Sequence, residues 1–256
     1  MTTQMVPIKE KAENFRGFLA ERKNEIGAAL ANAGITPDRL LRVVLTSAQK
    51  NPKLYECDLS SIYKSVLLCA QSGLLPDGIT GQAYLIPYKN GKTGRLEAQL
   101  QVGYKGYETL ARRTGEITVI SGNVVRANDV FDYQFGTDEF LRHRPSADAD
   151  RGAIVFFYAY ARFKVGHTQF IVMTKAEVDL IRARSMAKDE GPWATDYEQM
   201  GVKTAIRRLC KNLPQSEDMA RLLELDAKAE GGLPQNLDEI PMAEIVPPGE
   251  GADAAS

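Results

Sequence analysis

The 256-residue sequence carries 32 Lys and Arg against 33 Asp and Glu, and 44% of it is hydrophobic, a composition typical of a globular protein with a sizeable core. It contains no apolar run of the roughly 18 residues that a membrane span needs and no apolar signal region at its N-terminus, so we expect a cytoplasmic protein without a membrane partner. Cys57, Cys69 and Cys210 lie far apart, which favours buried free thiols over a disulfide, and His143 and His167 are too few for a clustered zinc site.

The charged residues are distributed unevenly. Residues 214–256 contain ten Asp and Glu against Arg221 and Lys228, which leaves residues 1–213 with 30 basic and 23 acidic residues. A basic body followed by an acidic, Pro/Gly-rich tail is common among nucleic-acid-binding proteins, in which the tail shields the site or recruits a partner. A tail that only keeps the protein in solution is the alternative.

The first 75 residues predict a helical lobe. Residues 9–33 are rich in Lys, Glu and Ala, and Thr36-Pro37 has the pattern of an N-cap followed by the first helical position. Gly73 is placed to end a helix that begins near Leu59.

From Gly81 the apolar pattern changes to a period of two, which is typical of strands. Residues 83–88 and 96–102 flank a glycine-containing turn and predict a hairpin, and residues 153–165 and 168–173 predict a second, more buried one. Two further strands are expected at 117–127 and 130–136.

The C-terminal part predicts helices and then a tail. A short helix is expected between Gly106 and Gly115, and two helices follow the strands, each opened by a Thr-x-x-Glu capping box, at Thr174 and at Thr195. Beyond Leu213 the abundance of acids, Pro and Gly predicts disorder. The sequence thus predicts an α+β fold with antiparallel hairpins, divided into an N-terminal helical lobe (1–75), an α+β core that ends in basic helices (76–213) and an acidic tail (214–256).

The last predicted helix has an apolar face and an adjoining basic face. Lys203, Arg207 and Lys211 recur every four residues, and Arg208 also lies away from the apolar stripe. After Glu198 no acid lies four residues from these cations, so we expect them to be unpaired and open to a phosphate backbone. A solvated helix face is the alternative.

Aromatic and cationic residues also lie close together around residues 101–117, where a nucleic acid would need both for its bases and phosphates. The tyrosines are candidates either for stacking or for the core, Gln99 and Gln101 share a polar strand face, and Trp193 either stacks on a base or positions the basic helix. The candidate DNA-binding residues are Lys89, Lys92, Arg95, Gln99, Gln101, Tyr104, Lys105, Tyr107, Arg112, Arg113, Arg126, Trp193, Lys203, Arg207, Arg208 and Lys211.

Two enzymatic alternatives have weak motifs. The segment Gly91-Lys92-Thr93 imitates the end of a Walker loop, but the glycine that this motif requires is replaced by Ile86, which excludes ATP hydrolysis by this motif. A metal-dependent nuclease would need converging carboxylates, whereas the candidates lie at turns around one short strand: Asp129, Asp132, Asp138 and Glu139. We therefore predict no catalytic residue, no metal ligand and no cofactor, with magnesium left open as a modulator of DNA binding.

Read together, four segments resemble the RecT family of phage and prophage single-strand annealing proteins: GLLPDGITGQAYLIPY, QLQVGYKGYETLARRTGEI, FDYQFGTDEFLRHRP and GPWATDYEQMGVKTAIRRLCKNLP. The resemblance implies a homo-oligomer, in rings or helical filaments, that binds single-stranded DNA and pairs complementary strands through an annealed duplex intermediate without ATP. It also implies a core similar to that of the eukaryotic annealing protein Rad52, and it suggests as partners a phage exonuclease and the host single-strand-binding protein.

The residues and the resemblance together lead to one hypothesis for the site. We expect a groove between the strands and the last basic helix, in which backbone contacts hold the strand while its base edges stay free to pair. The main alternative is a non-polymerising nucleic-acid-binding module, and a metal-dependent nuclease is a remote one.

Overall fold

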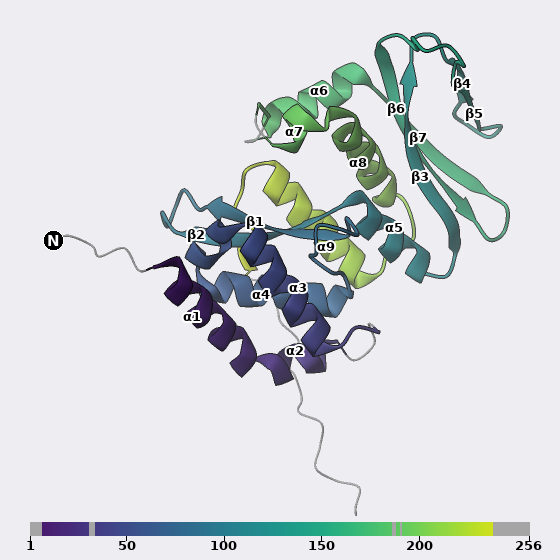
Figure 1. Ribbon diagram of the computed structural model, residues 1–256. Helices are drawn as coiled ribbons and strands as arrows, with labels where there is room; N and C mark the ends of the chain where they lie inside the picture. The colour runs from purple at the N-terminus through teal and green to yellow at the C-terminus, as the bar shows by residue number, and fades with distance from the viewer. Residues whose placement is uncertain (1–6, 31–33, 186–187, 190, 238–256) are drawn as a thin grey trace, which may run out of the picture. The chain divides into compact units, whose positions relative to one another are not determined.

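The computed structural model describes residues 7–30, 34–185, 188–189 and 191–237, which form two compact units (Figure 1). Unit 1 contains the described residues up to Gln101 and from Pro234 onward, and unit 2 runs from Val102 to Leu233. The predicted boundary at residue 75 does not coincide with this division, because the hairpin that follows Gly81 groups with the N-terminal helices.

Unit 1 begins with helices, as the sequence predicts. They are α1 (Ile8–Glu21), α2 (Lys23–Ala29), α3 (Pro37–Lys50), the 3-10 helix η1 (Pro52–Glu56) and α4 (Leu59–Ser72). Thr36 caps α3 by accepting a hydrogen bond from the Arg39 N–H (3.3 Å), and Gly73 ends α4 with φ of 58°, a left-handed conformation that glycine adopts without strain. Both predicted helix ends are confirmed. The helices bury a core that includes Phe15, Leu19, Ile26, Leu40, Val44 and Ile62.

The first predicted hairpin is also present, as β1 (Ala83–Lys89) and β2 (Leu96–Val102). The end of the described chain attaches to it, because the side-chain amide of Gln235 accepts a hydrogen bond from the Leu100 N–H (3.0 Å) and donates one to the Leu100 carbonyl (2.7 Å). A side chain thus pairs the backbone of β2 on the edge that β1 leaves open.

Unit 2 is built on an antiparallel sheet in the order β3 (Ile117–Arg126), β6 (Ile154–Phe163) and β7 (Thr168–Thr174). β6 and β7 form the predicted buried hairpin. β4 (Val130–Gln134) pairs with β5 (Phe140–Arg144), a strand that the sequence analysis missed because FLRHR is strand only through its pairing with β4. The combination of helices and antiparallel strands confirms the α+β class.

The helices of unit 2 that follow the sheet are α6 (Lys175–Arg184), α7 (Pro192–Thr195), α8 (Tyr197–Cys210) and α9 (Glu217–Glu230). The capping box of Thr174 and Glu177 is confirmed, since each side chain accepts a hydrogen bond from the other's N–H (3.2 and 2.9 Å). The second predicted box is wrong. Thr195 ends α7 and donates its hydroxyl to Asp196 (2.6 Å), which stands at the N-cap of α8. No helix in the described ranges is long and apolar enough to cross a membrane.

α9 corrects the prediction of disorder from residue 214 onward. The Ser216 side chain caps this helix by accepting a hydrogen bond from the Met219 N–H (3.2 Å). Apolar residues recur at helical spacing within the acidic segment, and the helix buries Met219, Leu222, Leu223 and Leu225. Residues 238–256 of the predicted tail lie outside the described residues.

The two faces of the three-stranded sheet are covered by different elements. On one face the ring of Phe131 in β4 stacks on Tyr158 of β6, with 5.6 Å between centroids, and Phe135 stacks on Phe170 of β7 at 5.1 Å. Successive strand residues point to opposite faces, so Phe157 points the other way, where it lies against Gly201 of α8. The β4–β5 arm and α8 therefore enclose the sheet between them.

The three cysteines are buried free thiols, as predicted. Burial raises the pKa values of Cys57 and Cys210 to about 12, so both thiols stay protonated at neutral pH.

Candidate nucleic-acid interface

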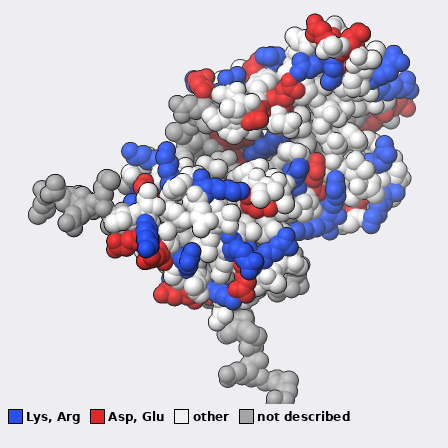
Figure 2. Space-filling view, in the orientation of Figure 1, with Lys and Arg blue, Asp and Glu red and all other residues white. Residues whose placement is uncertain are grey.

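α5 (Tyr104–Arg113) carries three exposed cations of the predicted site, Lys105, Arg112 and Arg113, which we call the α5 cluster. Figure 2 shows Lys and Arg side chains gathered over this helix. Glu108 and Arg112, four residues apart on the helix, form an ion pair with 3.9 Å between carboxylate and guanidinium. The Arg112 side chain is 53% exposed, so the pair with the largely covered Glu108 leaves it accessible to a phosphate.

The two tyrosines of α5 have different environments. Tyr107 is fully buried, and its hydroxyl donates a hydrogen bond to the Asp226 carboxylate (2.8 Å). Its ring therefore belongs to the core in this structure and is not open to a base. Tyr104 is partly exposed, with the Lys105 ammonium 5.9 Å from its ring centroid.

The expectation that the basic stripe of α8 is unpaired is wrong. The Lys203 ammonium lies 3.5 Å and the Arg207 guanidinium 3.6 Å from the Asp226 carboxylate, and Arg207 also pairs with Glu230. Both acids belong to α9 and lie 19 to 23 residues along the chain from the cations that they pair with, whereas the prediction considered only acids four residues away within α8. The side chains of Lys203 and Arg207 are only 12% and 11% exposed, so neither is an open phosphate contact here.

The other two predicted cations of α8 face solvent. Arg208 pairs with Glu177 of α6 at 3.2 Å, with both side chains about half exposed, and Lys211 is exposed at the C-cap of the helix. α8 thus presents two of its four predicted cations on the surface.

A groove of about 550 Å³ lies within unit 2, bordered by α5, α8, β3 and the β4–β5 arm; we call it the unit 2 groove. A groove between strands and α8 was expected, but α8 does not line it with its basic stripe. Its lining residues on α8 are Glu198, Gln199, Val202 and Ile206. The remaining walls are polar and aromatic, with Tyr104, Asn123, His143, Arg151 and Tyr158.

A network of hydrogen bonds that was not predicted from the sequence fixes the β4–β5 arm beside this groove. The Asp129 carboxylate accepts two hydrogen bonds from Arg151 (2.9 and 2.6 Å) and one from the Ser146 N–H (2.9 Å). His143 joins the same carboxylate (3.1 Å) to the Tyr158 hydroxyl (3.1 Å). The Arg151 hydrogen bonds hold the pKa of Asp129 well below its ordinary range, so the carboxylate is charged at neutral pH. The sequence gives no signal for this network, because its residues come together only when β4 pairs with β5.

Arg126 and Trp193, also predicted to bind DNA, are engaged within unit 2. Arg126 pairs with Glu198 of α8 and donates to the Gly152 carbonyl (3.0 Å). Trp193 is 3% exposed and its ring lies 6.1 Å from that of Tyr197. Of the two roles considered for Trp193, the structure supports the structural one.

In unit 1 the hairpin cations Lys89, Lys92 and Arg95 are exposed around the β1–β2 turn. The expected polar strand face is not a free surface, because Gln99 is only 2% exposed and Gln101 is half-buried.

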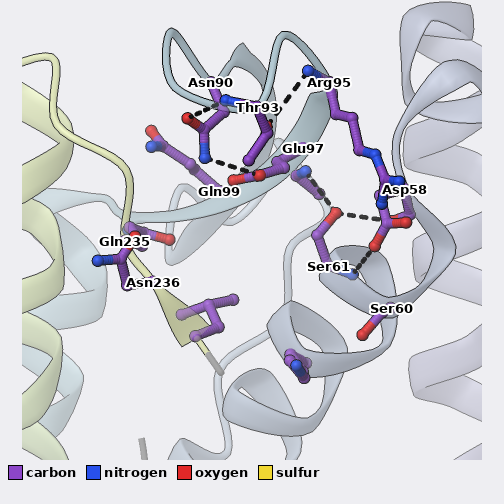
Figure 3. A pocket seen from close by; sticks show the side chains of 13 residues that line it. Asp58, Ser60, Ser61, Asn90, Thr93, Arg95, Glu97, Gln99, Gln235 and Asn236 are labelled. Carbon is purple, nitrogen blue, oxygen red and sulfur yellow. Dashed lines mark hydrogen bonds between the residues drawn. The ribbon is translucent and has the colours of Figure 1, made fainter. Parts of the chain in front are cut away.

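A polar pocket lies beside this turn, lined by residues of the hairpin, the start of α4 and the segment after Pro234 (Figure 3). Two of the polar groups that line it are paired within the protein. The Asn90 amide donates to Glu97 (2.8 Å), and Gln235 pairs with Leu100. These hydrogen bonds hold parts of unit 1 together, which indicates a structural role for the two groups.

Comparison with known proteins places these residues in a family. Residues 38–233 match the RecT family. The chain is 43% identical over 208 residues to Protein RecT of Escherichia coli strain K12, a similarity that covers 80% of this chain and 77% of that protein. It is also 26% identical over 207 residues to the uncharacterized protein YqaK of Bacillus subtilis strain 168, covering 79% of this chain and 68% of that protein.

The chain therefore belongs to the RecT family, as its four motif segments indicated. This membership assigns it to the phage-type recombination and annealing proteins.

Proposed function

We propose that this protein binds single-stranded DNA and pairs complementary strands without ATP, as a ring or helical homo-oligomer. The observation that carries the proposal is the family match, which spans residues 38–233 and so includes all of unit 2. The 43% identity to Protein RecT supports it over most of both chains.

The exposed cations are suited to the physical requirement of annealing. Two complementary strands repel each other through their phosphates, and cations that neutralise a strand release its counterions and reduce this repulsion. The protein must leave the base edges free, so contacts to the backbone are the suitable kind. We assign these contacts to the α5 cluster with Arg208 and Lys211 in unit 2, and to Lys89, Lys92 and Arg95 in unit 1.

Oligomer formation supplies the affinity that one subunit lacks. Each subunit offers a few exposed cations, and contacts on successive subunits add along one continuous strand. A ring or filament therefore binds a long strand tightly while each contact stays weak enough to exchange during pairing.

The test is ATP-free annealing of two complementary dye-labelled oligonucleotides, with and without magnesium. Wild type should accelerate pairing, and Arg112→Gln/Arg113→Gln should lose affinity for the single strand by about 25-fold near 0.1 M salt, because each lost phosphate contact is worth about 0.7 in the slope of log affinity against log salt. Arg184→Gln/Lys188→Gln is the matched control, since it removes the same charge from exposed positions at the end of α6 and beyond it, and should behave as wild type.

Three results would contradict the proposal. Binding without acceleration of pairing, by a protein that stays small on DNA in analytical ultracentrifugation, would favour the non-polymerising module. Cleavage of either oligonucleotide in magnesium would favour the nuclease. Equal losses in the α5 variant and the α6 control would mean that only net charge matters, and would remove the α5 cluster from the site.

A further inference from the structure

The contact between α8 and α9 brings four charged side chains and a tyrosine hydroxyl into the interior of unit 2. Lys203 and Arg207 of α8 meet Asp226 and Glu230 of α9, and the Tyr107 hydroxyl donates to Asp226. Asp226 is 1% exposed. Such burial has a large desolvation cost, which the ion pairs offset only if every polar atom is well satisfied.

This network is not fully satisfied. The Arg207 Nη1 and Glu230 Oε1 atoms are buried without a hydrogen-bond partner, and they are the two side-chain atoms of this kind in the part of the chain that the structure describes. Burial also raises the pKa of Glu230 above its ordinary value, against the opposing effect of Arg207. An ion-pair cluster with unsatisfied atoms adds little to stability, and this makes the α8–α9 contact a candidate for exchange with another anion.

The hydrogen-bond donors of this network determine which kind of anion could replace the carboxylates of α9. Two cations and a hydroxyl converge on carboxylate oxygens, and the same donors bind phosphate oxygens. The carboxylates of α9 therefore stand where the phosphodiesters of a strand would have to bind if the basic stripe of α8 were used. The loop between α8 and α9 is only residues 211–216, which keeps α9 close to α8 at high local concentration.

We propose that α9 is an acidic cover over a second phosphate-binding site, in which Asp226 and Glu230 hold Lys203 and Arg207 until a DNA strand displaces them. The inference rests on the proposed function, because it regulates the same binding of single-stranded DNA. It implies that the cations open in the free protein make the first contacts, and that Lys203 and Arg207 are added only when α9 has moved.

The test compares two variants with the same change in charge. Asp226→Asn/Glu230→Gln removes the two carboxylates that face α8, and Glu217→Gln/Glu224→Gln removes two exposed ones from the same helix. The first variant should bind a single strand about 25-fold more tightly near 0.1 M salt, with a salt slope steeper by about 1.4, since two phosphate contacts are gained. The second should gain much less. Adding Lys203→Gln/Arg207→Gln to the first variant should abolish its gain.

A measurement on wild type keeps the inference testable if the first variant does not fold. Hydrogen exchange of the α9 amides should become faster when the strand is bound, because α9 loses its ion pairs with α8 and opens more often. Slower or unchanged exchange in α9 would overturn the cover.

The two proposals fail in different ways. If neither wild type nor any variant binds single-stranded DNA, the proposed function is overturned together with the cover. If wild type binds and anneals but Asp226→Asn/Glu230→Gln gains no more than Glu217→Gln/Glu224→Gln, the cover alone is overturned.

Discussion

The contact between α8 and the sheet predicts a large effect of one methyl group. A Cβ atom added to Gly201 would lie 2.2 Å from Cε1, 2.5 Å from Cζ and 2.6 Å from Cδ1 of Phe157. Carbon atoms pack at about 3.5–4.0 Å, so the ring would have to withdraw by more than about 1 Å. Phe157 is 0% exposed, and a rigid ring inside a packed core has no free space into which to move.

Two opposing terms set the size of the effect of Gly201→Ala. Overpacking a core costs about 1–3 kcal/mol, and the upper end applies to a buried ring. Replacing Gly by Ala within a helix contributes about 1 kcal/mol in the stabilising direction. We therefore expect a net loss of about 2 kcal/mol, which lowers the melting temperature by roughly 6 °C in a domain of this size.

Urea unfolding followed by circular dichroism gives the free energy, and hydrogen exchange assigns it to unit 2. Gly17→Ala is the control, because Gly17 lies within α1 with nothing inside 4 Å of the added atom and should stabilise by about 0.5–1 kcal/mol. Combining Gly201→Ala with Phe157→Leu should remove most of the clash. If Gly201→Ala stabilises the protein as Gly17→Ala does, α8 does not approach β6 as described.

Two further substitutions test the local structure of unit 2. Thr174→Ala should lower the free energy of unfolding by about 1 kcal/mol through loss of the α6 cap, whereas Thr195→Ala should change it by less than about 0.5 kcal/mol; equal urea midpoints would contradict this. Asp129→Asn should cost about 2–3 kcal/mol at pH 7, since hydrogen bonds to a charged group contribute about 1.5–3 kcal/mol. Because the Arg151 hydrogen bonds lower the Asp129 pKa in the folded state below its ordinary 3.8, this stabilisation is present above about pH 4 and is lost as the pH falls. Urea titrations should therefore show the difference from wild type shrinking below pH 4, and a constant difference would refute the assignment.

Features that depend on neighbouring residues could be predicted from the sequence. The Thr36 cap, the left-handed Gly73 and the two hairpins at 83–102 and 154–174 are set by side chains within a few positions of one another. The family was also evident, because its motifs are short and contiguous. The cations of the α5 cluster were identified from their closeness to aromatic residues in the sequence, and the structure places them on the surface.

Features that depend on distant pairing became visible only in the tertiary structure. Lys203 and Arg207 were predicted to be unpaired because no acid lies four residues from them within α8. In the structure Asp226 and Glu230 of α9 pair with them. Tyr107 is held in the core by the same helix.

β5 is another feature that depends on pairing, because its strand conformation comes from its hydrogen bonds with β4. The physical reason is that an ion pair or a ladder of hydrogen bonds requires only proximity in space, which leaves no periodic signal in the chain. The sequence by itself determined the family and most of the helices and strands, whereas the tertiary structure decided which of the predicted cations lie on the surface and which are paired in the interior.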